Sequence, residues 1–238
     1  MASEHIFERY ELKYLVSLTQ YTDLLYALQP YIRPDRYPTA TIGSLYYDTP
    51  DRRLIRRSLE HPYYKEKLRV RSYGAAGGTD PVFVELKKKY DHVVYKRRVA
   101  LPCDEAYTYL ETGRCSSPNT QILREIGYCR QLYPALAPSM LLLYDREAFV
   151  AQSDPSLRIT FDRRIRFRTQ ALSLSDVQTG EPLLPDACLL EVKTSGALPL
   201  WLLKLLGERK LYRTSFSKYG RAFELVNARS RTDFLIHI

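Results

Sequence analysis

The chain has 238 residues, and 36 lysines and arginines against 27 aspartates and glutamates give it a formal net charge of +9. Its hydrophobic content of 45% is too high for a disordered basic tail, and its length is ample to bury a core. A folded protein with this charge predicts an anionic partner: nucleic acid, a phosphate-rich small molecule or an anionic membrane surface.

Several classes of protein are excluded by motif and composition. No run approaches the ~18 apolar residues of a membrane-spanning helix, and the first eight residues lack the apolar core of a signal peptide. We therefore expect a cytoplasmic protein whose four cysteines are free thiols. The cysteines and histidines lack zinc-site spacing, and no GxxxxGK[ST], GxGxxG or GxSxG motif occurs.

Alternation of apolar and polar residues with a period of two predicts eight strands, at residues 6–16, 41–48, 63–73, 81–90, 92–101, 139–150, 156–168 and 187–194. Helical patterns fall at residues 21–31, 51–60, 104–111, 119–133, 199–208 and 217–229. No internal repeat or long linker interrupts the chain. We predict one domain over residues 1–238, with tunnel strands at about 6–194 and C-terminal helices at about 198–229.

The polar faces of the predicted strands carry mostly arginine and lysine. Residues 65, 67, 69 and 71 form one such face, opposite Leu68 and Val70. A solvated face explains any single strand, because half-buried antiparallel strands normally alternate in this way. Over six strands, however, like charges on neighbouring strands repel unless something anionic lies between them.

An eight-stranded antiparallel barrel satisfies this pattern, because it turns the charged faces into a lumen and leaves the apolar faces to the helices. The predicted fold is therefore α+β and β-dominated, a closed eight-stranded antiparallel tunnel barrel with flanking helices. A lumen lined mainly with cations is predicted to bind a polyanion.

Arginine forks and lysine ammonium groups suit phosphoryl oxygens. Eight cations on the polar faces are candidate catalytic and phosphate-binding residues: Lys13, Arg69, Arg71, Lys87, Lys96, Arg146, Arg158 and Lys193. Three carboxylates share these faces, Glu11, Glu85 and Glu191. They pair with neighbouring cations or bind Mg²⁺ or Mn²⁺ bridged to phosphate oxygens, and neither interpretation excludes the other.

Eight short motifs follow one another along the chain: Arg9-x-Glu11-x-Lys13, Lys67-Leu-Arg69-Val-Arg71, Val84-Glu85-Leu-Lys87, Tyr95-Lys96-Arg97-Arg98, Tyr144-Asp-Arg146, Leu157-Arg158-Ile-Thr160-Phe-Asp162, Leu190-Glu191-Val-Lys193 and Phe216-Ser217-Lys218-Tyr219. The ordered series, over about residues 5 to 226, resembles the VTC domain of polyphosphate polymerases, in the triphosphate tunnel metalloenzyme superfamily. The resemblance implies a divalent metal, Mn²⁺ or Mg²⁺. It also implies transfer of the γ-phosphate of a nucleoside triphosphate, with ATP expected, onto a growing inorganic polyphosphate.

By matching position, the resemblance assigns phosphate binding to the same eight cations, to Arg98 and to Lys218. It makes Glu191 the main metal ligand, assisted by Glu11 and Glu85. The superfamily opens with Glu-x-Glu-x-Lys, and Arg9 in place of the first glutamate favours the VTC branch over thiamine or RNA triphosphatases. Ser58 stands where eukaryotic members place a phosphate-binding arginine, and whether Arg56 or Arg57 substitutes stays open.

Other functions remain as alternatives. If water replaces the phosphate acceptor, the same site acts as a triphosphate or polyphosphate hydrolase. If no reaction takes place there, the protein is a non-catalytic polyphosphate-binding module. A nucleic-acid binder should place stacking aromatics beside the cations. Tyr10, Tyr14 and Tyr95 instead fall on apolar faces, so we expect no nucleic acid. Nucleotide preference, chain length, oligomeric state and a membrane partner stay open.

Overall fold

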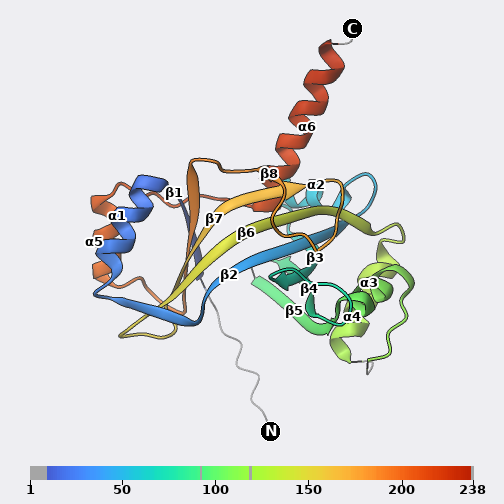
Figure 1. Ribbon diagram of the computed structural model, residues 1–238, viewed down its shortest axis with the longest axis horizontal. Coiled ribbons are helices and arrows are strands. Elements are labelled where there is room, and N and C mark those ends of the chain that lie inside the picture. Colours follow the sequence, from blue (N-terminus) through green and yellow to red (C-terminus); the bar gives the residue numbers. More distant parts are fainter. Residues whose placement is uncertain (1–9, 92, 118–119, 237–238) are drawn as a thin grey trace. The chain divides into compact units, whose positions relative to one another are not determined.

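The structure, a computed structural model, describes residues 10–91, 93–117 and 120–236 (Figure 1). Its strands are β1 (Tyr10–Ser17), β2 (Ile32–Asp48), β3 (Tyr64–Tyr73), β4 (Pro81–Tyr90), β5 (Val93–Pro102), β6 (Ala137–Ala151), β7 (Arg158–Arg168), β8 (Glu181–Pro182) and β9 (Ala187–Thr194). Its helices are α1 (Leu18–Leu28), α2 (Arg53–Leu59), α3 (Cys103–Thr112), α4 (Gln121–Leu132), α5 (Leu200–Glu208) and α6 (Lys218–Ile236). Each predicted strand and helix has a counterpart, although residues 6–9 of the first predicted strand, residue 92 of the fifth and residue 119 of the fourth predicted helix lie outside the described part.

The strands form one nine-stranded sheet with the order β1-β9-β7-β6-β2-β3-β4-β5, and β8 pairs with β7. The pairs β1–β9, β2–β3, β3–β4, β4–β5, β7–β8 and β7–β9 are antiparallel, so the β-dominated, antiparallel prediction is confirmed. Closure into an eight-stranded barrel is not confirmed. In the described part of the chain, no hydrogen-bonded pairing joins β1 to β5, the two ends of this order. The additional strand, β8, has two residues, too few for an alternating pattern to reveal.

The chain divides into two compact units. The first contains the described residues of Met1–Ala40, Tyr144–Ile165 and Leu184–Phe216, and the second those of Thr41–Leu143, Arg166–Leu183 and Ser217–Ile238. Strands β2, β6 and β7 contribute residues to both units. The single domain of the sequence analysis stays a prediction.

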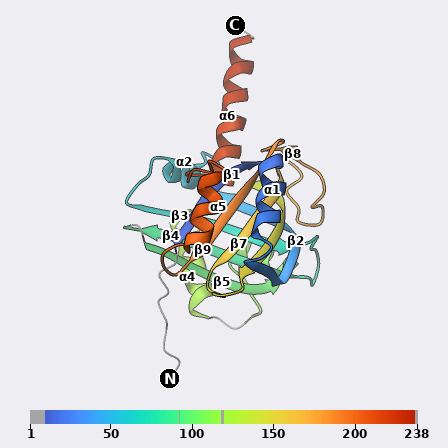
Figure 2. The same cartoon turned by 90° about the vertical axis from the view of Figure 1, so that its left-hand side faces the viewer.

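In the first unit, α1 and α5 cover the apolar face of β1, β9 and β7 (Figure 2). Helix α1 begins in a capping box, because the Ser17 hydroxyl accepts from the Gln20 amide while the Gln20 side chain accepts from the Ser17 amide. Alternating residues of the strands meet the helices in one core, which includes Tyr14, Val16, Leu24, Leu28, Ile159, Phe161, Leu190, Val192, Leu202 and Leu206. The charged residues of the same strands are left on the opposite face.

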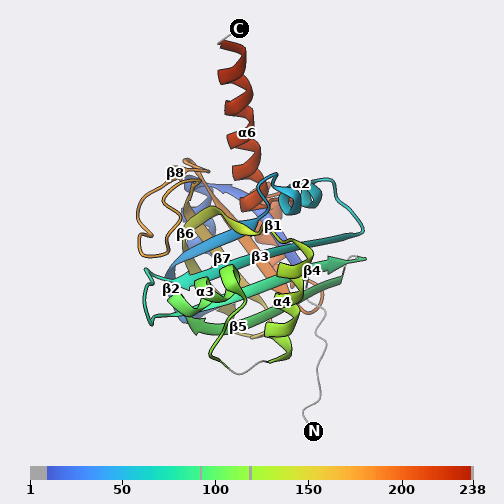
Figure 3. The same cartoon turned by 90° about the vertical axis from the view of Figure 1, so that its right-hand side faces the viewer.

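In the second unit, α3 and α4 cover the apolar face of β3, β4 and β5 (Figure 3). Helix α3 ends at Gly113, whose φ of 82° is the left-handed conformation that glycine adopts without a Cβ penalty. The core between helices and strands includes Leu68, Val70, Val82, Val84, Leu86, Leu101, Ala106, Leu110, Leu123 and Ile126. Period-two alternation then places Arg69, Arg71, Glu85 and Lys87 on the other face of the strands.

The largest difference from the predicted elements is the start of β2, at Ile32 rather than residue 41. Pro34 and Pro38 interrupt this stretch, and most of its residues are exposed, so the sequence lacks the alternation that marks the second half of the strand. Among the described residues, no helix combines the length and the apolar character needed to cross a membrane.

Candidate phosphate-binding site

The Glu85 cluster lies on the polar face of β3, β4 and β5 in the second unit and consists of Arg69, Arg71, Glu85, Lys96 and Arg98. Strand register builds it, because Arg69 is opposite Glu85 and Glu85 is opposite Arg98. Arg69 Nη2 lies 2.6 Å from Glu85 Oε2, and Arg71 Nε lies 4.0 Å from the same oxygen. Lys96 Nζ and Arg98 Nε lie 2.9 and 3.1 Å from Glu85 Oε1. Four cations thus share one carboxylate whose side chain is 1% exposed.

Electrostatics keeps Glu85 ionised. Burial alone would raise the pKa of Glu85, but Arg69, Arg71 and Lys96 outweigh it and lower the pKa to about 2. Burial lowers the pKa of Lys96, and ion pairing with Glu85 offsets part of this effect. Because both Glu85 oxygens are engaged by cations, the geometry favours the ion-pair interpretation of Glu85 over the metal-ligand one.

A row of lysines runs beside this cluster. Lys67 on β3 is opposite Lys87 on β4, which is opposite Lys96 on β5. Like charges directly opposite one another destabilise a sheet unless an anion compensates them. Two residues earlier on β3, Lys65 is opposite Lys89, and burial together with Lys89 and Lys87 lowers the pKa of Lys65.

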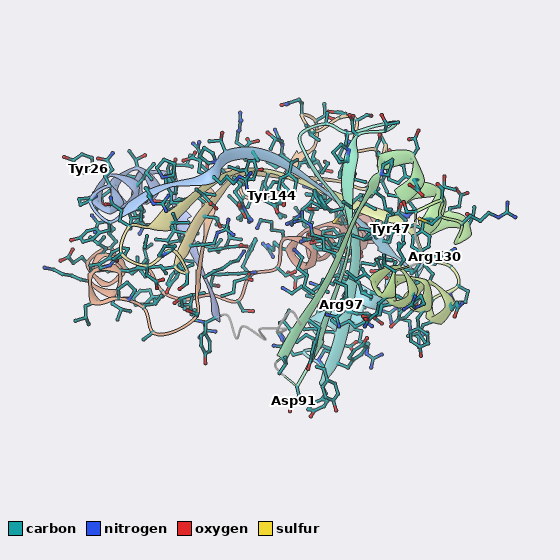
Figure 4. All side chains as sticks on the ribbon, turned by 90° about the horizontal axis from the view of Figure 1, so that it is seen from below. Tyr26, Tyr47, Asp91, Arg97, Arg130 and Tyr144 are labelled. Carbon is teal, nitrogen blue, oxygen red and sulfur yellow. The ribbon has the colours of Figure 1, made fainter. Side chains whose placement is uncertain are left out.

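Arg97, on the opposite face of β5 from the Glu85 cluster, pairs with a helix instead. Arg97 Nε donates to both carboxylate oxygens of Glu125 on α4, at 3.1 and 3.0 Å. Figure 4 labels Arg97 on this strand and Asp91 at the turn that joins β4 to β5. Arg97 and Arg98 are therefore neighbours in sequence with separate environments, one bound to a helix and one in the Glu85 cluster.

Tyr46, which was not among the predicted site residues, joins the Glu85 cluster from β2. Arg69 Nη1 donates to the Tyr46 hydroxyl at 2.9 Å, and the Tyr46 ring stacks on Tyr219 with centroids 4.4 Å apart. Burial would raise the pKa of Tyr46, but Arg69, Lys67 and Arg71 lower it to about 8. The sequence placed Tyr46 in a predicted strand, but its position opposite Arg69 depends on the register between β2 and β3.

A second missed residue, Asp48, ties the start of α6 to β2 and α2. Its buried carboxylate accepts from the amides of Leu54 and Ile55 at 2.8 and 3.0 Å and from the Tyr219 hydroxyl at 2.9 Å. Two residues before Tyr219, just ahead of α6, Ser217 Oγ accepts from Lys67 Nζ at 3.1 Å. Lys218, a predicted phosphate-binding residue, is the first residue of α6 and is half-buried.

Two aromatic residues of β3 and β4 also lie beside the cations. Arg98 Nη2 donates to the Tyr73 hydroxyl at 2.9 Å, and the Arg98 guanidinium lies 3.7 Å from the Phe83 ring centroid. Tyr10 and Tyr95, which are exposed, and Tyr14, which is buried, share faces with apolar residues as expected. The separation of aromatics from cations is thus less complete than the three predicted tyrosines indicate.

The Glu191 cluster occupies the first unit and consists of Glu11, Lys13, Arg146, Asp162, Glu191 and Lys193. Lys13 is opposite Glu191, and Glu11 is opposite Lys193, on the paired strands β1 and β9. Lys13 Nζ lies 3.1 Å from Glu11 Oε1 and 3.9 Å from Glu191 Oε1, and donates to the Phe216 carbonyl at 3.0 Å. This cluster therefore brings two predicted metal ligands to one lysine.

Arg146 anchors the other side of the Glu191 cluster. Its guanidinium donates to both oxygens of Asp162, at 2.6 and 2.7 Å, and to Glu191 Oε2 at 3.3 Å. Burial would lower the pKa of Arg146, but Tyr144, Asp162 and Glu191 raise it well above its ordinary value. Lys193 Nζ is 3.6 Å from Glu191 Oε2. Asp162 belongs to a motif noted in the sequence but was not among the predicted site residues.

Glu11 and Glu191 are the carboxylates of the Glu191 cluster that were predicted to bind a divalent ion, and cations also lie within ion-pair reach of both Glu191 oxygens, as they do for Glu85. Glu191 is nearly buried and Glu11 is one-third exposed, and both lie around Lys13. Among the described residues, no group of three or more His, Cys, Asp or Glu side chains gathers as a metal cage. Mg²⁺ commonly uses one or two carboxylates with substrate phosphates and water, which is the donor set that Glu11 and Glu191 offer.

The remaining predicted residues belong to neither cluster, although two of them neighbour one. Lys87 is exposed within the lysine row. Arg158 is opposite Lys193 and forms an ion pair with Asp35 of β2. On α2, Arg56 pairs with Asp51 at 3.7 Å, and the Arg57 guanidinium lies 5.9 Å from the Tyr64 ring centroid, so these contacts place neither in the Glu85 cluster. Arg9 lies outside the described residues.

Comparisons with known proteins concern the family and the fold of the chain. Residues 8–227 match the family model described as the VTC domain. No curated protein matches the sequence. A Bacillus halodurans protein of known structure, described as a candidate adenylate cyclase, has the same fold with a TM-score of 0.54 and 15% identity, covering 87% of this chain and 92% of that one. The PH1819 protein of Pyrococcus horikoshii has a TM-score of 0.47 and 12% identity, covering 91% of this chain and 99% of that one.

Proposed function

The chain belongs to the VTC domain family, and from that membership we propose that it is a metal-dependent polyphosphate polymerase. Its reaction would move the γ-phosphate of a nucleoside triphosphate, with ATP as the expected donor, onto a growing polyphosphate chain. The observation that carries the proposal is the Glu85 cluster, in which four cations share one buried carboxylate.

A chain of phosphates suits this cluster better than a single carboxylate ligand. Arg69 and Arg71 are two residues apart on β3, so they point to the same face about 6.5–7 Å apart along the strand and can hold separate phosphates. Charge-assisted contacts of this kind are the strong hydrogen bonds of protein sites. The row formed by Lys67, Lys87 and Lys96 extends the same preference along β3, β4 and β5.

The proposed mechanism needs little covalent chemistry from the protein. Phosphoryl transfer depends mainly on positioning the reacting groups and on stabilising the charge of the transferred group. Arg69, Arg71 and Arg98 would bind phosphoryl oxygens and fix their orientation. The terminal phosphate of the acceptor is already an oxyanion, so the reaction does not require a general base.

In this proposal Glu191 and Glu11 hold the divalent ion, and Asp162 holds Arg146 in place beside them. When bound, the ion supplies neutralisation of phosphate oxygens. Lys13 and Lys193 then act as phosphate ligands, because both already lie within ion-pair reach of Glu191. Glu85 serves as the internal counter-ion that keeps its four cations in place.

One experiment separates the proposed polymerase from its alternatives. Purified protein is incubated with ATP and Mn²⁺, and the products are resolved by size. Phosphate chains support the polymerase, free phosphate supports the hydrolase, and no turnover together with tight tripolyphosphate binding supports a binding module.

A pair of neighbouring substitutions then tests whether the Glu85 cluster carries the activity. Arg98→Ala removes a cation of the cluster, whereas Arg97→Ala removes one that faces α4 on the same strand. The proposal requires that product formation falls in the first variant and persists in the second. Equal activity in both variants would overturn the assignment of the site to this face of the sheet.

A further inference from the structure

An open pocket of about 480 Å³ lies in the first unit, beside the first residues of β2. Its lining residues come from four places: the start of β2 (Arg33, Pro34, Asp35 and Arg36), the end of β6 (Val150), the turn before β7 (Pro155) and the first residue of β7 (Arg158). We call it the arginine pocket. Three of its seven lining residues are arginines and one is an aspartate, so the lining has a net positive charge, which favours the binding of an anion.

The contacts within the arginine pocket leave two of its cations without an acidic partner. Asp35 forms an ion pair with Arg158 and accepts from the Arg36 backbone amide at 2.7 Å. Within residues 10–91, 93–117 and 120–236, the side chains of Arg33 and Arg36 form no ion pair. The Arg36 guanidinium lies 5.4 Å from the ring centroid of Tyr37, a contact that orients it without neutralising it.

Strand register connects the arginine pocket with the Glu191 cluster inside the same unit. Arg158 of the pocket is directly opposite Lys193 of the cluster on the paired strands β7 and β9. Lys193 and Glu191 are two residues apart on β9, about 6.5–7 Å along the strand. Because β9, β7, β6 and β2 are consecutive in the sheet, Arg158 reaches across β6 to Asp35. Cations thus continue from the cluster to the pocket.

We propose that the arginine pocket is an accessory anion site, which binds the distal phosphates of a polyphosphate chain whose other phosphates occupy the Glu191 cluster. The inference rests on the proposed function and adds a dependence on chain length. A ligand long enough to reach both places gains a second set of contacts within one molecule, so its affinity exceeds that of a ligand that occupies one place. A triphosphate whose phosphates all occupy the Glu191 cluster leaves none for Arg33 and Arg36, so tripolyphosphate and ATP are expected to bind without them.

The test compares ligands of three kinds by calorimetric titration: ATP, tripolyphosphate and long-chain polyphosphate. The test variant is Arg33→Gln with Arg36→Gln, which removes two pocket charges and keeps polar side chains. The matched control is Lys204→Gln with Lys210→Gln, which removes two exposed charges of the same unit, one on α5 and one two residues after its end. Both variants have the same net charge, so a general electrostatic effect changes both alike.

The expected result is selective for long chains. Long-chain polyphosphate binds the test variant about 10-fold or more weakly than the control, since charge-assisted contacts are lost, and with a shallower dependence on salt. ATP and tripolyphosphate affinities, and ATP turnover, stay the same. Equal long-chain affinity in the two variants, or an equal loss for tripolyphosphate and ATP, would overturn the accessory site while leaving the proposed function in place. A wild-type protein that binds none of the three ligands overturns the proposed function and this inference with it.

Discussion

Replacing Glu85 by glutamine should lower the free energy of unfolding of the ligand-free protein and tighten its binding of polyanions. The substitution keeps the shape of the side chain but removes the negative charge that four cations share. The pKa of Glu85 is lowered from its ordinary value of 4.5 to about 2. One pKa unit corresponds to about 1.4 kcal/mol, so ionised Glu85 contributes about 3 kcal/mol to the free energy of unfolding at neutral pH.

The sign of the pH dependence follows from the direction of this shift. A carboxyl whose pKa is depressed by folding stabilises the protein fully above its unfolded pKa, here 4.5, and loses that contribution as the pH falls toward 2. The free energies of unfolding of wild type and Glu85→Gln should therefore differ by about 3 kcal/mol at pH 7 and converge in acid. Urea unfolding at a series of pH values measures the difference.

Ligand binding should change in the opposite direction. In the wild-type protein, phosphate oxygens compete with Glu85 for the same guanidinium and ammonium groups, and the substitution removes the competitor. Tripolyphosphate should raise the melting temperature of Glu85→Gln more than that of the wild type. Glu125→Gln is the control, because its half-exposed pair with Arg97 is worth only about 0–1 kcal/mol. A Glu85→Gln protein with wild-type stability, or with weaker tripolyphosphate binding, would refute the argument.

Three further predictions concern individual side chains. Arg71→Ala should weaken tripolyphosphate binding roughly 10–150-fold, and Arg97→Ala should not; calorimetric titration at two salt concentrations measures both affinities. Glu191→Gln should abolish turnover at saturating Mn²⁺ while phosphate binding persists, and unchanged turnover would make Glu191 an ion-pair partner only. Ultraviolet titration should show a tyrosine that ionises near pH 8 and is missing in Tyr46→Phe, because Arg69, Lys67 and Arg71 overcome the effect of burial. Since folding lowers that pKa, Tyr46 should add stability as the pH rises from 8 toward 10, and a wild-type titration identical to that of Tyr46→Phe would contradict it.

Much of the fold follows from local alternation of side chains. Leu68 and Val70 alternate with Arg69 and Arg71, and the structure places the first pair under α3 and α4 and the second pair on the opposite face. Barrel closure depends on whether the first and last strands of the sheet pair, which no local pattern encodes. The start of β2 was also missed, because Pro34 and Pro38 conceal an extended segment whose side chains are mostly exposed.

The cations of the candidate site could be predicted from the sequence, whereas the acidic residues that they pair with could not. A row of like charges is visible in one strand, and the sequence indicates that Arg69 and Arg71 share a face. Which acid meets them depends on register between strands, so the convergence on Glu85 emerges only in the folded chain. Asp48 illustrates the limit, because its contacts with α2 and Tyr219 join residues far apart in sequence.

The Asp48 carboxylate also offers a reporter for the docking of α6. It accepts hydrogen bonds from the backbone amides of Leu54 and Ile55 and, on the same side chain, from the Tyr219 hydroxyl. Tyr219 in turn stacks on Tyr46, which binds Arg69 of the Glu85 cluster. Amide hydrogen exchange at Leu54 and Ile55 is therefore coupled to the first turn of a helix more than 160 residues away in sequence. The exchange rates of these two amides therefore report whether the first turn of α6 is docked, without any label placed in the phosphate-binding cluster.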